Sequence, residues 1–245
     1  MRVRGRSALV TGASSGIGAA TADALHAAGT RLLLTGTDTT RLAEVAARTG
    51  GTPLPADLTD PADLDRVCQA ATEVDLLVHS AGRGWAGELT GMPAERVTEL
   101  TALNLVAPIR LTAAAVPAMR ARGLGHLVFV SSIATVGVRG EAVYAASKAG
   151  LRAFAASLRY EVAADGLGVT TVFPGAVATP FFERRGLPYD RRFPRPVPSE
   201  AVAAALLHAV QRDVAEVFVP GWLTVPARIN GALPGLFHRL AARFG

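Results

Sequence analysis

Tyr144 and Lys148, in the run Tyr-Ala-Ala-Ser-Lys, have the types and spacing that suit proton chemistry. Residues four apart share one face of a helix, so the phenol and the ammonium would lie side by side. A free tyrosine has a pKa near ~10, and moving it to 7 requires about 4 kcal/mol of extra phenolate stabilisation. One cation about 4 Å away, at an effective dielectric constant of about 20, supplies roughly that much. A compact lysine ammonium can do this and also donate to ribose hydroxyls.

The alternative for this pair is a surface tyrosine beside an unrelated lysine. The composition argues against it, because Lys148 is the only lysine in an arginine-rich chain and Tyr144 is one of three tyrosines. The pair therefore favours an acid–base centre. The five histidines are scattered without metal-ligand spacing, so we expect them to be structural or solvated and expect no metal site.

A glycine-rich segment, Thr11–Gly18, has the pattern Gly-x-x-x-Gly-x-Gly between an apolar run and a helical one. Glycines let the backbone approach a pyrophosphate, whose charge meets the free N–H groups and the dipole of a helix N-terminus. A structural turn is the alternative for the loop alone. Its position between the first strand and the first helix favours a nucleotide site.

The end of the second expected strand, residues 34–38 (Leu-Thr-Gly-Thr-Asp), bears on which dinucleotide binds. NAD-binding proteins usually place a carboxylate here for the ribose hydroxyls. Gly36 and Thr37 occupy the expected positions, Asp38 lies slightly beyond them, and Arg41 is nearby. We expect NADP, with NAD as the alternative.

Short apolar runs alternate with longer segments of helical period. The expected strands are Ala8–Thr11, Arg31–Thr35, Thr52–Pro55, Leu76–His79, Leu127–Ser131, Val169–Phe173 and Val214–Val219. The expected helices are Ile17–Ala28, Thr40–Thr49, Ala62–Ala71, Ala94–Arg122, Tyr144–Ala164 and Glu200–Arg212. Nearly continuous apolar strands are typical of parallel sheets covered on both faces. The alternation predicts an α/β, single-domain, doubly wound parallel sheet with helices on both faces (Rossmann fold) and ligands at the carboxyl ends of its strands.

The composition limits which other classes of protein the chain could belong to. Half of the 245 residues are apolar and 18% are charged, so one domain can bury a sizeable core. The single cysteine, Cys68, excludes an intrachain disulfide and fits a cytoplasmic location. We expect no signal peptide and no segment long enough to span a bilayer. The net charge of +5 comes from dispersed arginines, so we do not expect nucleic-acid binding.

Taken together, these residues resemble the short-chain dehydrogenase/reductase (SDR) family from about Val3 to Val219. Thr11–Gly18 resembles the family's cofactor signature, and Tyr144 and Lys148 fall on its Tyr-x-x-x-Lys motif. The resemblance implies an NAD(P)-dependent enzyme acting on CH–OH donors or the corresponding carbonyls, in a homodimer or homotetramer assembled through helices.

Ser131-Ser132 resembles the segment that carries the family's catalytic serine. The usual spacing to the tyrosine selects Ser131, but we assign Ser132, since the second serine of the pair normally fills the role. Asn104 matches the family's helical asparagine, which orders a water chain to the lysine. The catalytic residues implied by the resemblance are Asn104, Ser132, Tyr144 and Lys148.

Further segments resemble the family's cofactor contacts. Asp57-Leu58 resembles the adenine contact, and Pro174-Gly175 with Thr179 resembles the segment that closes over the nicotinamide. Residues 79–82 (His-Ser-Ala-Gly) depart from the family's usual Asn-Asn-Ala-Gly at the first two positions. The resemblance therefore implies that Ala81 and Gly82 contact the cofactor through their backbone atoms. The residues expected to bind the cofactor are Gly12, Ser14, Ser15, Gly16, Ile17, Gly18, Thr37, Asp57, Leu58, Ala81, Gly82, Tyr144, Lys148, Pro174, Gly175, Val177 and Thr179.

The implied reaction is the transfer of hydride to a carbonyl carbon while Tyr144 donates a proton to its oxygen. Ser132 hydrogen-bonds that oxygen, and Lys148 holds the ribose and lowers the tyrosine pKa. Oxidation of an alcohol is the reverse. One alternative is a 3-oxoacyl thioester reductase whose substrate hangs from an acidic carrier. The other is a non-catalytic dinucleotide sensor, against which the intact catalytic residues argue.

The chain divides into a dinucleotide-binding and catalytic domain, 1–221, which includes a lid loop at 179–198, and an amphipathic helical tail, 222–245. The tail mixes apolar residues with arginines, so it suits docking on the protein's own core or a second subunit, covering of a lipophilic substrate, or association with a membrane surface. The lid is also apolar, with Phe181, Phe182, Leu187 and Phe193. Lid and tail together favour a hydrophobic small-molecule substrate.

Overall fold

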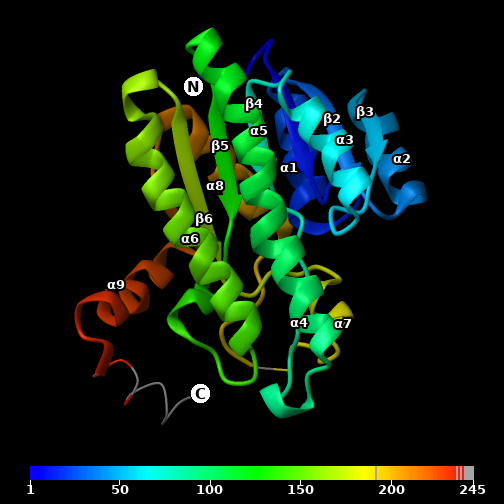
Figure 1. The fold of residues 1–245 in the computed structure, drawn as a ribbon. Helices are drawn as coiled ribbons and strands as arrows, with labels where there is room; N and C mark the ends of the chain where they lie inside the picture. The colour runs from blue at the N-terminus through cyan, green and yellow to red at the C-terminus, as the bar shows by residue number, and fades with distance from the viewer. Residues whose placement is uncertain (191, 236, 238, 240–245) are drawn as a thin grey trace.

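One parallel sheet organises the protein, whose structure is a computed structural model that describes residues 1–190, 192–235, 237 and 239 (Figure 1). Within these residues seven strands pair in the order β3-β2-β1-β4-β5-β6-β7. The strands are β1 (Ser7–Thr11), β2 (Arg31–Gly36), β3 (Thr52–Pro55), β4 (Leu76–His79), β5 (His126–Val130), β6 (Gly168–Pro174) and β7 (Glu216–Val219). The order reverses between β1 and β4, and such a switch point is where open α/β sheets bind ligands.

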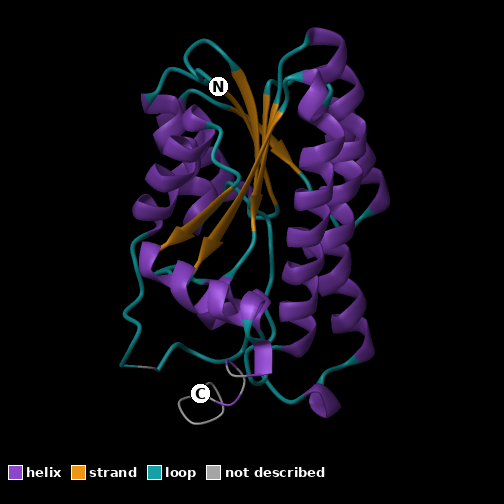
Figure 2. Cartoon of the chain, turned by 90° about the vertical axis from the view of Figure 1, so that its left-hand side faces the viewer, coloured by secondary structure: helices purple, strands orange, loops and turns teal. Residues whose placement is uncertain are grey.

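Helices cover both faces of the sheet (Figure 2). They are α1 (Gly16–Ala27), α2 (Thr39–Thr49), α3 (Pro61–Ala71), α4 (Ala94–Thr101), α5 (Ala107–Arg122), α6 (Ala142–Val162), α7 (Phe181–Arg184), α8 (Ser199–Arg212) and α9 (Thr224–Ala232). One core cluster joins the sheet to α3, α5 and α6, and a second joins its other face to α1, α2 and α8. Every residue of β5 and β6 is buried, as expected for central strands covered on both sides. The predicted fold class is confirmed.

The strand arrows point towards the end of the molecule where α4, α7 and α9 gather (Figure 1). The lid carries α7, and its isolated bridge between Val177 and Val197 closes the lid loop at its base. Of the predicted tail helix, the structure has α9, while residues 236, 238 and 240–245 lie outside the described residues. Lid and tail therefore lie at the carboxyl edge of the sheet, the edge predicted to bind ligands.

The stretch Ala94–Arg122 has the length and mean hydropathy, 1.4, of a membrane span. The expectation that no segment is long enough to span a bilayer is therefore wrong for this stretch. Half of its most apolar window is buried within the fold, where α4 packs against α6 and α5 against α3. These contacts explain its apolar character as that of a core helix.

Candidate active site

The glycine loop lies directly against the turn that follows β4. A Cβ atom at Gly12, whose φ is +67°, would lie 2.8 Å from the backbone of Ala81, and one at Gly18 would lie 2.2 Å from the carbonyl oxygen of Gly12. No side chain fits at either position. The side chain of Ser15 does not cap α1, so it leaves the first N–H groups of that helix available. This cradle fits a pyrophosphate.

The residues predicted to contact the adenosine half of the cofactor follow the neighbouring strands β2 and β3. Thr37, Asp57 and Leu58 all line the same cleft as the glycine loop. Burial works to raise the pKa of Asp57, but hydrogen bonds from Thr59 and the charge of Arg83 hold that pKa below its usual value. Asp57 is thus a carboxylate at neutral pH.

Asp38 has a structural partner instead of facing the cleft. Its carboxylate accepts a hydrogen bond from the backbone N–H of Arg41 at 3.0 Å, which makes it the N-cap of α2, and it forms an ion pair with the Arg41 side chain at 3.5 Å. Neither residue is among those that line the cleft. The ribose end of the site therefore presents Gly36 and Thr37.

His79, which stands where the resemblance leads one to expect an asparagine, is buried at the end of β4. Its ring stacks on Phe129 with centroids 4.8 Å apart, and Nε2 lies 3.0 Å from the Thr112 hydroxyl. Burial lowers the pKa of His79 to about 3, so the ring is neutral. The turn after it is held by the Thr11 hydroxyl, which accepts from the backbone N–H groups of Ser80 and Ala81 at 3.0 Å. His79 acts as a core residue.

Tyr144 and Lys148 lie on one face of α6 and are both buried, with 7% and 5% of their surface exposed. The Tyr144 hydroxyl shares a hydrogen bond with Ser132, which follows β5. The Lys148 Nζ donates to the carbonyl oxygen of Val130 at 2.9 Å. Parallel strand β5 and helix α6 thus bring the three predicted catalytic groups to one point of the cleft.

Burial raises the pKa of Tyr144 to about 12; the Ser132 hydrogen bond and the charge of Arg185 lower it, and the charge of Glu141 raises it. Burial also lowers the pKa of Lys148 to about 8. That Lys148 lowers the tyrosine pKa stays a prediction. The lid also brings a second cation, Arg185, towards the phenol.

Asn104 lies behind the cleft, fully buried, in a π-helical turn (Ala102–Val106) between α4 and α5. Its amide donates to the carbonyl oxygen of Arg83 at 2.9 Å and to the Ser147 hydroxyl at 3.1 Å, and its oxygen accepts from the Arg83 N–H at 3.0 Å. A Cβ atom at Gly82 would lie 3.2 Å from the Asn104 oxygen and 3.4 Å from Lys148 Nζ. Asn104 thus links α6 to the turn after Gly82. Single π-helical turns within α-helices are frequent at functional sites.

The two candidate serines have different environments. Ser131 is buried and donates its hydroxyl to the backbone carbonyl of Lys148 at 3.0 Å, which fixes α6 against β5. Ser132 lies beside the Tyr144 hydroxyl and also accepts from the Ala134 N–H at 3.1 Å. The geometry therefore gives Ser132 the contact that the catalytic role requires and gives Ser131 a structural contact.

The segment after β6 forms the opposite wall of the cleft. Pro174, Gly175, Val177 and Thr179 all line it, and the Thr179 side chain lies 3.0 Å from where a Cβ atom of Gly16 would be. The structure thus places all the predicted cofactor-binding residues around one cleft of about 1780 Å³.

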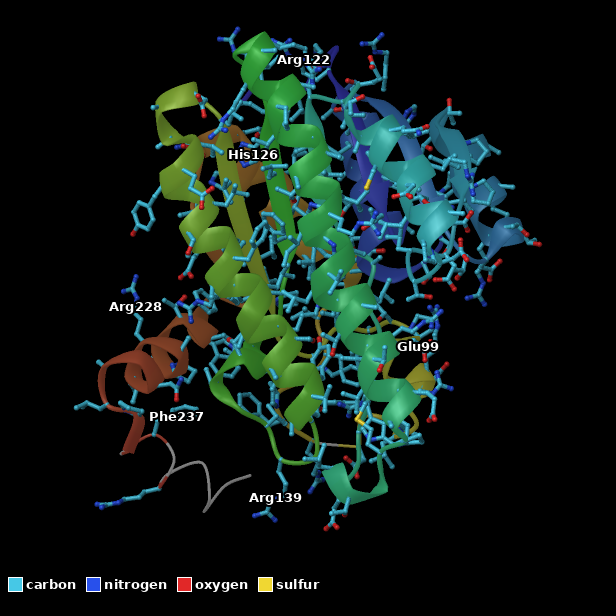
Figure 3. All side chains as sticks on the ribbon, in the orientation of Figure 1. Glu99, Arg122, His126, Arg139, Arg228 and Phe237 are labelled. Atoms are coloured by element: carbon cyan, nitrogen blue, oxygen red, sulfur yellow. The ribbon has the colours of Figure 1, made fainter. Side chains whose placement is uncertain are left out.

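Sequence reasoning missed several residues of this cleft. Trp85, Val138 and Glu141 line it close to Tyr144, as does Arg185 of the lid. The apolar lid residues Phe181, Phe182 and Leu187, which the sequence did indicate, line its outer part together with Trp222 and Ile229 of the tail. Phe237 also lines it, from the tail end of the molecule where Arg139 and Arg228 lie, while Arg122 and His126 lie at the far end (Figure 3). A tryptophan among glycines, Arg83 to Gly87, was the available signal for Trp85.

The comparisons with known proteins agree with this geometry. The model of the short chain dehydrogenase family matches residues 6–189, so the chain belongs to the short-chain dehydrogenase/reductase family. It is an NAD(P)-dependent oxidoreductase of that family.

Three curated relatives are similar to the chain. An uncharacterised oxidoreductase of Myxococcus xanthus is 36% identical over 250 residues, which cover 97% of this chain and 96% of that protein. The 3-oxoacyl-acyl-carrier-protein reductase of Escherichia coli is 37% identical over 78% of this chain and 81% of its own. The dehydrogenase/reductase SDR family member 7B of Danio rerio is 37% identical over 70% of this chain, which spans 60% of that protein.

Two solved structures share the fold over nearly the whole chain. A short-chain dehydrogenase from Sphingobium yanoikuyae in complex with NADPH has a TM-score of 0.85 at 32% identity, covering 97% of this chain and 95% of its own. A bulky-bulky ketone specific alcohol dehydrogenase from Comamonas testosteroni has a TM-score of 0.80 at 27% identity, covering 94% of both chains. A nicotinamide dinucleotide is therefore the cofactor class.

Proposed function

We propose that the chain interconverts a hydrophobic ketone and its alcohol with NADP(H), using Tyr144 as proton donor and acceptor. The observation that carries this proposal is the position of Ser132, Tyr144 and Lys148 in a cleft whose outer wall is made of apolar lid and tail side chains. Such a cleft encloses an apolar substrate and leaves one polar corner for its oxygen.

Each group of the polar corner has a defined task. The bound nicotinamide supplies or accepts the hydride. Tyr144 gives its proton to the carbonyl oxygen, and Ser132, which shares a hydrogen bond with that phenol, orients the oxygen and stabilises developing charge. Lys148 keeps further N–H donors besides the one bound to Val130, and these suit ribose hydroxyls. Asn104 holds the turn and helix in place behind them.

NADP is the proposed dinucleotide because, among the described residues at the end of β2, Gly36 and Thr37 line the cleft and the carboxylate of Asp38 does not. Asp38 is engaged as the cap of α2, whereas Thr37 and Ser14 offer hydroxyl groups that do not repel a 2′-phosphate. The similarity to a structure that holds NADPH supports the same choice. Arg41 is close enough to Asp38 to form an ion pair with it and is the nearest cation along the chain.

A bulky apolar ketone fits the outer cleft. Phe181 packs with its ring centroid 5.5 Å from that of Tyr144, and Trp222 of the tail stacks on Phe193 of the lid at 5.6 Å. Lid and tail thus meet over the substrate end. The similar alcohol dehydrogenase that is specific for bulky-bulky ketones supports this class of substrate.

The alternative substrate is a 3-oxoacyl thioester presented by a carrier. The 37% identity to the Escherichia coli 3-oxoacyl-acyl-carrier-protein reductase favours it. The net charge of +5 would suit an acidic carrier, and Arg139 and Arg228 lie at the cleft end of the molecule. This alternative differs from the first in requiring a thioester.

A cofactor-oxidation screen tests both proposals. NADPH consumption is followed with small ketones, bulky aromatic or polycyclic ketones, and 3-oxoacyl thioesters, and Tyr144→Phe serves as the blank. We expect the highest kcat/KM with the bulky ketones. Preference for a carrier-bound thioester over free ketones would favour the alternative, and turnover that persists in Tyr144→Phe would overturn the role of the tyrosine.

A further inference from the structure

A largely buried ion pair connects the lid to the helix that carries the catalytic tyrosine. Arg185 directly follows α7, and Glu141 directly precedes α6, three residues before Tyr144. The two side chains form an ion pair and are only 12% and 14% exposed. In the other ion pairs among the described residues the arginine side chain is at least 32% exposed. A pair withdrawn from water acts strongly on its surroundings because solvent screens it little.

Arg185 is fixed by more than Glu141. Its guanidinium lies over the Phe182 ring at 4.7 Å from the centroid, and its Nε donates to the carbonyl oxygen of Leu187 at 3.2 Å. Its own carbonyl accepts from the N–H of Ala86. The lid, the 84–87 loop and the start of α6 therefore meet at this one arginine.

The Tyr144 hydroxyl faces groups from three elements. Ser132 hydrogen-bonds it from the end of β5, Glu141 directly precedes its own helix and Lys148 belongs to that helix, and Arg185 comes from the lid. Glu141, Arg185 and Lys148 line the same cleft as Tyr144, and the charges of Glu141 and Arg185 act on the phenol with opposite sign. If the lid moved away, the carboxylate of Glu141 would remain beside Tyr144 without its counter-charge.

We propose that Arg185 is a positioning residue whose ion pair with Glu141 both holds the lid closed on the catalytic helix and neutralises the carboxylate that faces the tyrosine. The inference rests on the proposed acid–base role of Tyr144. Its consequence is that loss of the phenol proton is easiest when the lid encloses the substrate. Closure and proton chemistry are then coupled through one pair of charges.

The experiment compares Arg185→Met, Glu141→Gln and the double variant as holoenzymes with saturating NADP⁺. The readout is the pH at half-maximal kcat/KM for oxidation of the best alcohol, since the tyrosine must lose its proton to act as a base. Arg185→Met should move this midpoint up by about one pH unit, the size of shift that a nearby charge produces, and Glu141→Gln should move it down. In the double variant the midpoint should return close to that of the wild type while KM stays raised about tenfold, because the lid link is still missing.

Arg152→Met is the matched control, because Arg152 lies on the same helix as Tyr144 and its ion pair, with Glu216 of β7, does not involve the lid. It should leave the midpoint unchanged. Midpoints that do not move in the two single variants, or that move in the same direction, would overturn the proposal and leave the pair a purely structural one.

Trypsin cleavage of the lid separates this inference from the proposed function, since it needs no turnover. The lid contains Arg184 and Arg192 as cleavage sites, and Arg185→Met should be cut there several times faster than Arg152→Met. Equal cleavage rates would refute the lid link even in an active enzyme. Faster cleavage in a protein that turns over no ketone or alcohol would instead reject the proposed function and retain the link.

Discussion

Replacing Tyr144 by phenylalanine keeps the ring packed against Phe181 and removes the proton. We expect kcat to fall by at least ~100-fold, the low end for the loss of acid–base catalysis. NADPH binding should survive, because the glycine loop is untouched, and a fluorescence titration of the nicotinamide checks this. Turnover within a few-fold of the wild type would refute the assignment of the acid.

The adjacent serines provide a matched pair of substitutions. Ser132→Ala removes the hydroxyl beside the phenol and should lower kcat by about 100-fold with little change in stability. Ser131→Ala removes a buried hydrogen bond to the Lys148 carbonyl and should lower the free energy of unfolding by about 1–3 kcal/mol with a smaller effect on kcat. Steady-state kinetics and urea unfolding measure the two quantities. The reverse pattern would make Ser131 the catalytic serine.

At the level of the elements, the cap of α2 tests the choice of dinucleotide. Asp38→Ala removes the N-cap and should cost about 1 kcal/mol of stability. Because the carboxylate is bound to the helix, NADPH should still bind more tightly than NADH in both proteins. Titrations of each nucleotide into wild type and variant measure this preference. Tighter NADH binding by the wild type, lost in Asp38→Ala, would show that Asp38 binds the ribose.

The tail makes a prediction that separates its three proposed uses. Trp222 lines the cleft and Val225, three residues later, does not, so Trp222→Ala and Val225→Ala form a matched pair. Loss of roughly 100 Å² of apolar contact costs about 2.5 kcal/mol, so Trp222→Ala should raise KM for bulky ketones more than tenfold, and Val225→Ala should not. Raised KM for small and bulky ketones alike would contradict a tail that covers the substrate.

Sedimentation with anionic vesicles checks the membrane alternative for the tail. Trp222, Val225 and Leu233 are exposed apolar side chains on the tail, so a membrane-binding tail would lose vesicle association in both alanine variants. If neither kinetics nor vesicle binding changes and only the melting temperature falls, the tail is a packing element.

The sequence pattern over short segments was enough to predict the helices and strands that position the site. The glycine loop, the Tyr144–Lys148 spacing and the apolar strands each depend on neighbours within one turn or one strand, and the observed elements begin and end within about two residues of most predicted bounds. The Glu141–Arg185 pair and the position of Trp85 could not be predicted in this way. They depend on the path of a lid that returns to α6 after 44 residues, which packing decides and local propensity does not.

For the whole molecule, two buried histidines predict how stability depends on pH. Burial lowers the pKa of His79 to about 3 and that of His126 to about 4, against about 6.5 in an unfolded chain. Below pH ~6.5 the unfolded state therefore binds more protons than the folded state. The contribution of the neutral histidines to the free energy of unfolding is fully present above that pH. It falls as the pH drops towards 4, by up to about 1.4 kcal/mol per pH unit for each histidine.

His79→Asn should remove one of these contributions, and His26→Asn, at an exposed position, is the control. Urea unfolding at pH 7.5 and pH 5 measures the difference in unfolding free energy between the two conditions. It should be smaller in His79→Asn than in the wild type or the control. An equal difference in all three proteins would show that carboxylates, not His79, govern the acid limb.

The chain has two tryptophans, and both line the cleft, Trp85 beside the catalytic end and Trp222 on the tail. All of its indole emission therefore originates at the walls of the ligand site. The reduced nicotinamide absorbs where indoles emit, so bound NADPH should quench both tryptophans by energy transfer, and a substrate without such absorption should change mainly their emission colour. The Phe193–Trp222 stack makes the second tryptophan sensitive to lid position as well. The protein thus contains its own optical reporter, and Trp85→Phe and Trp222→Phe would divide the signal between cofactor binding and lid movement.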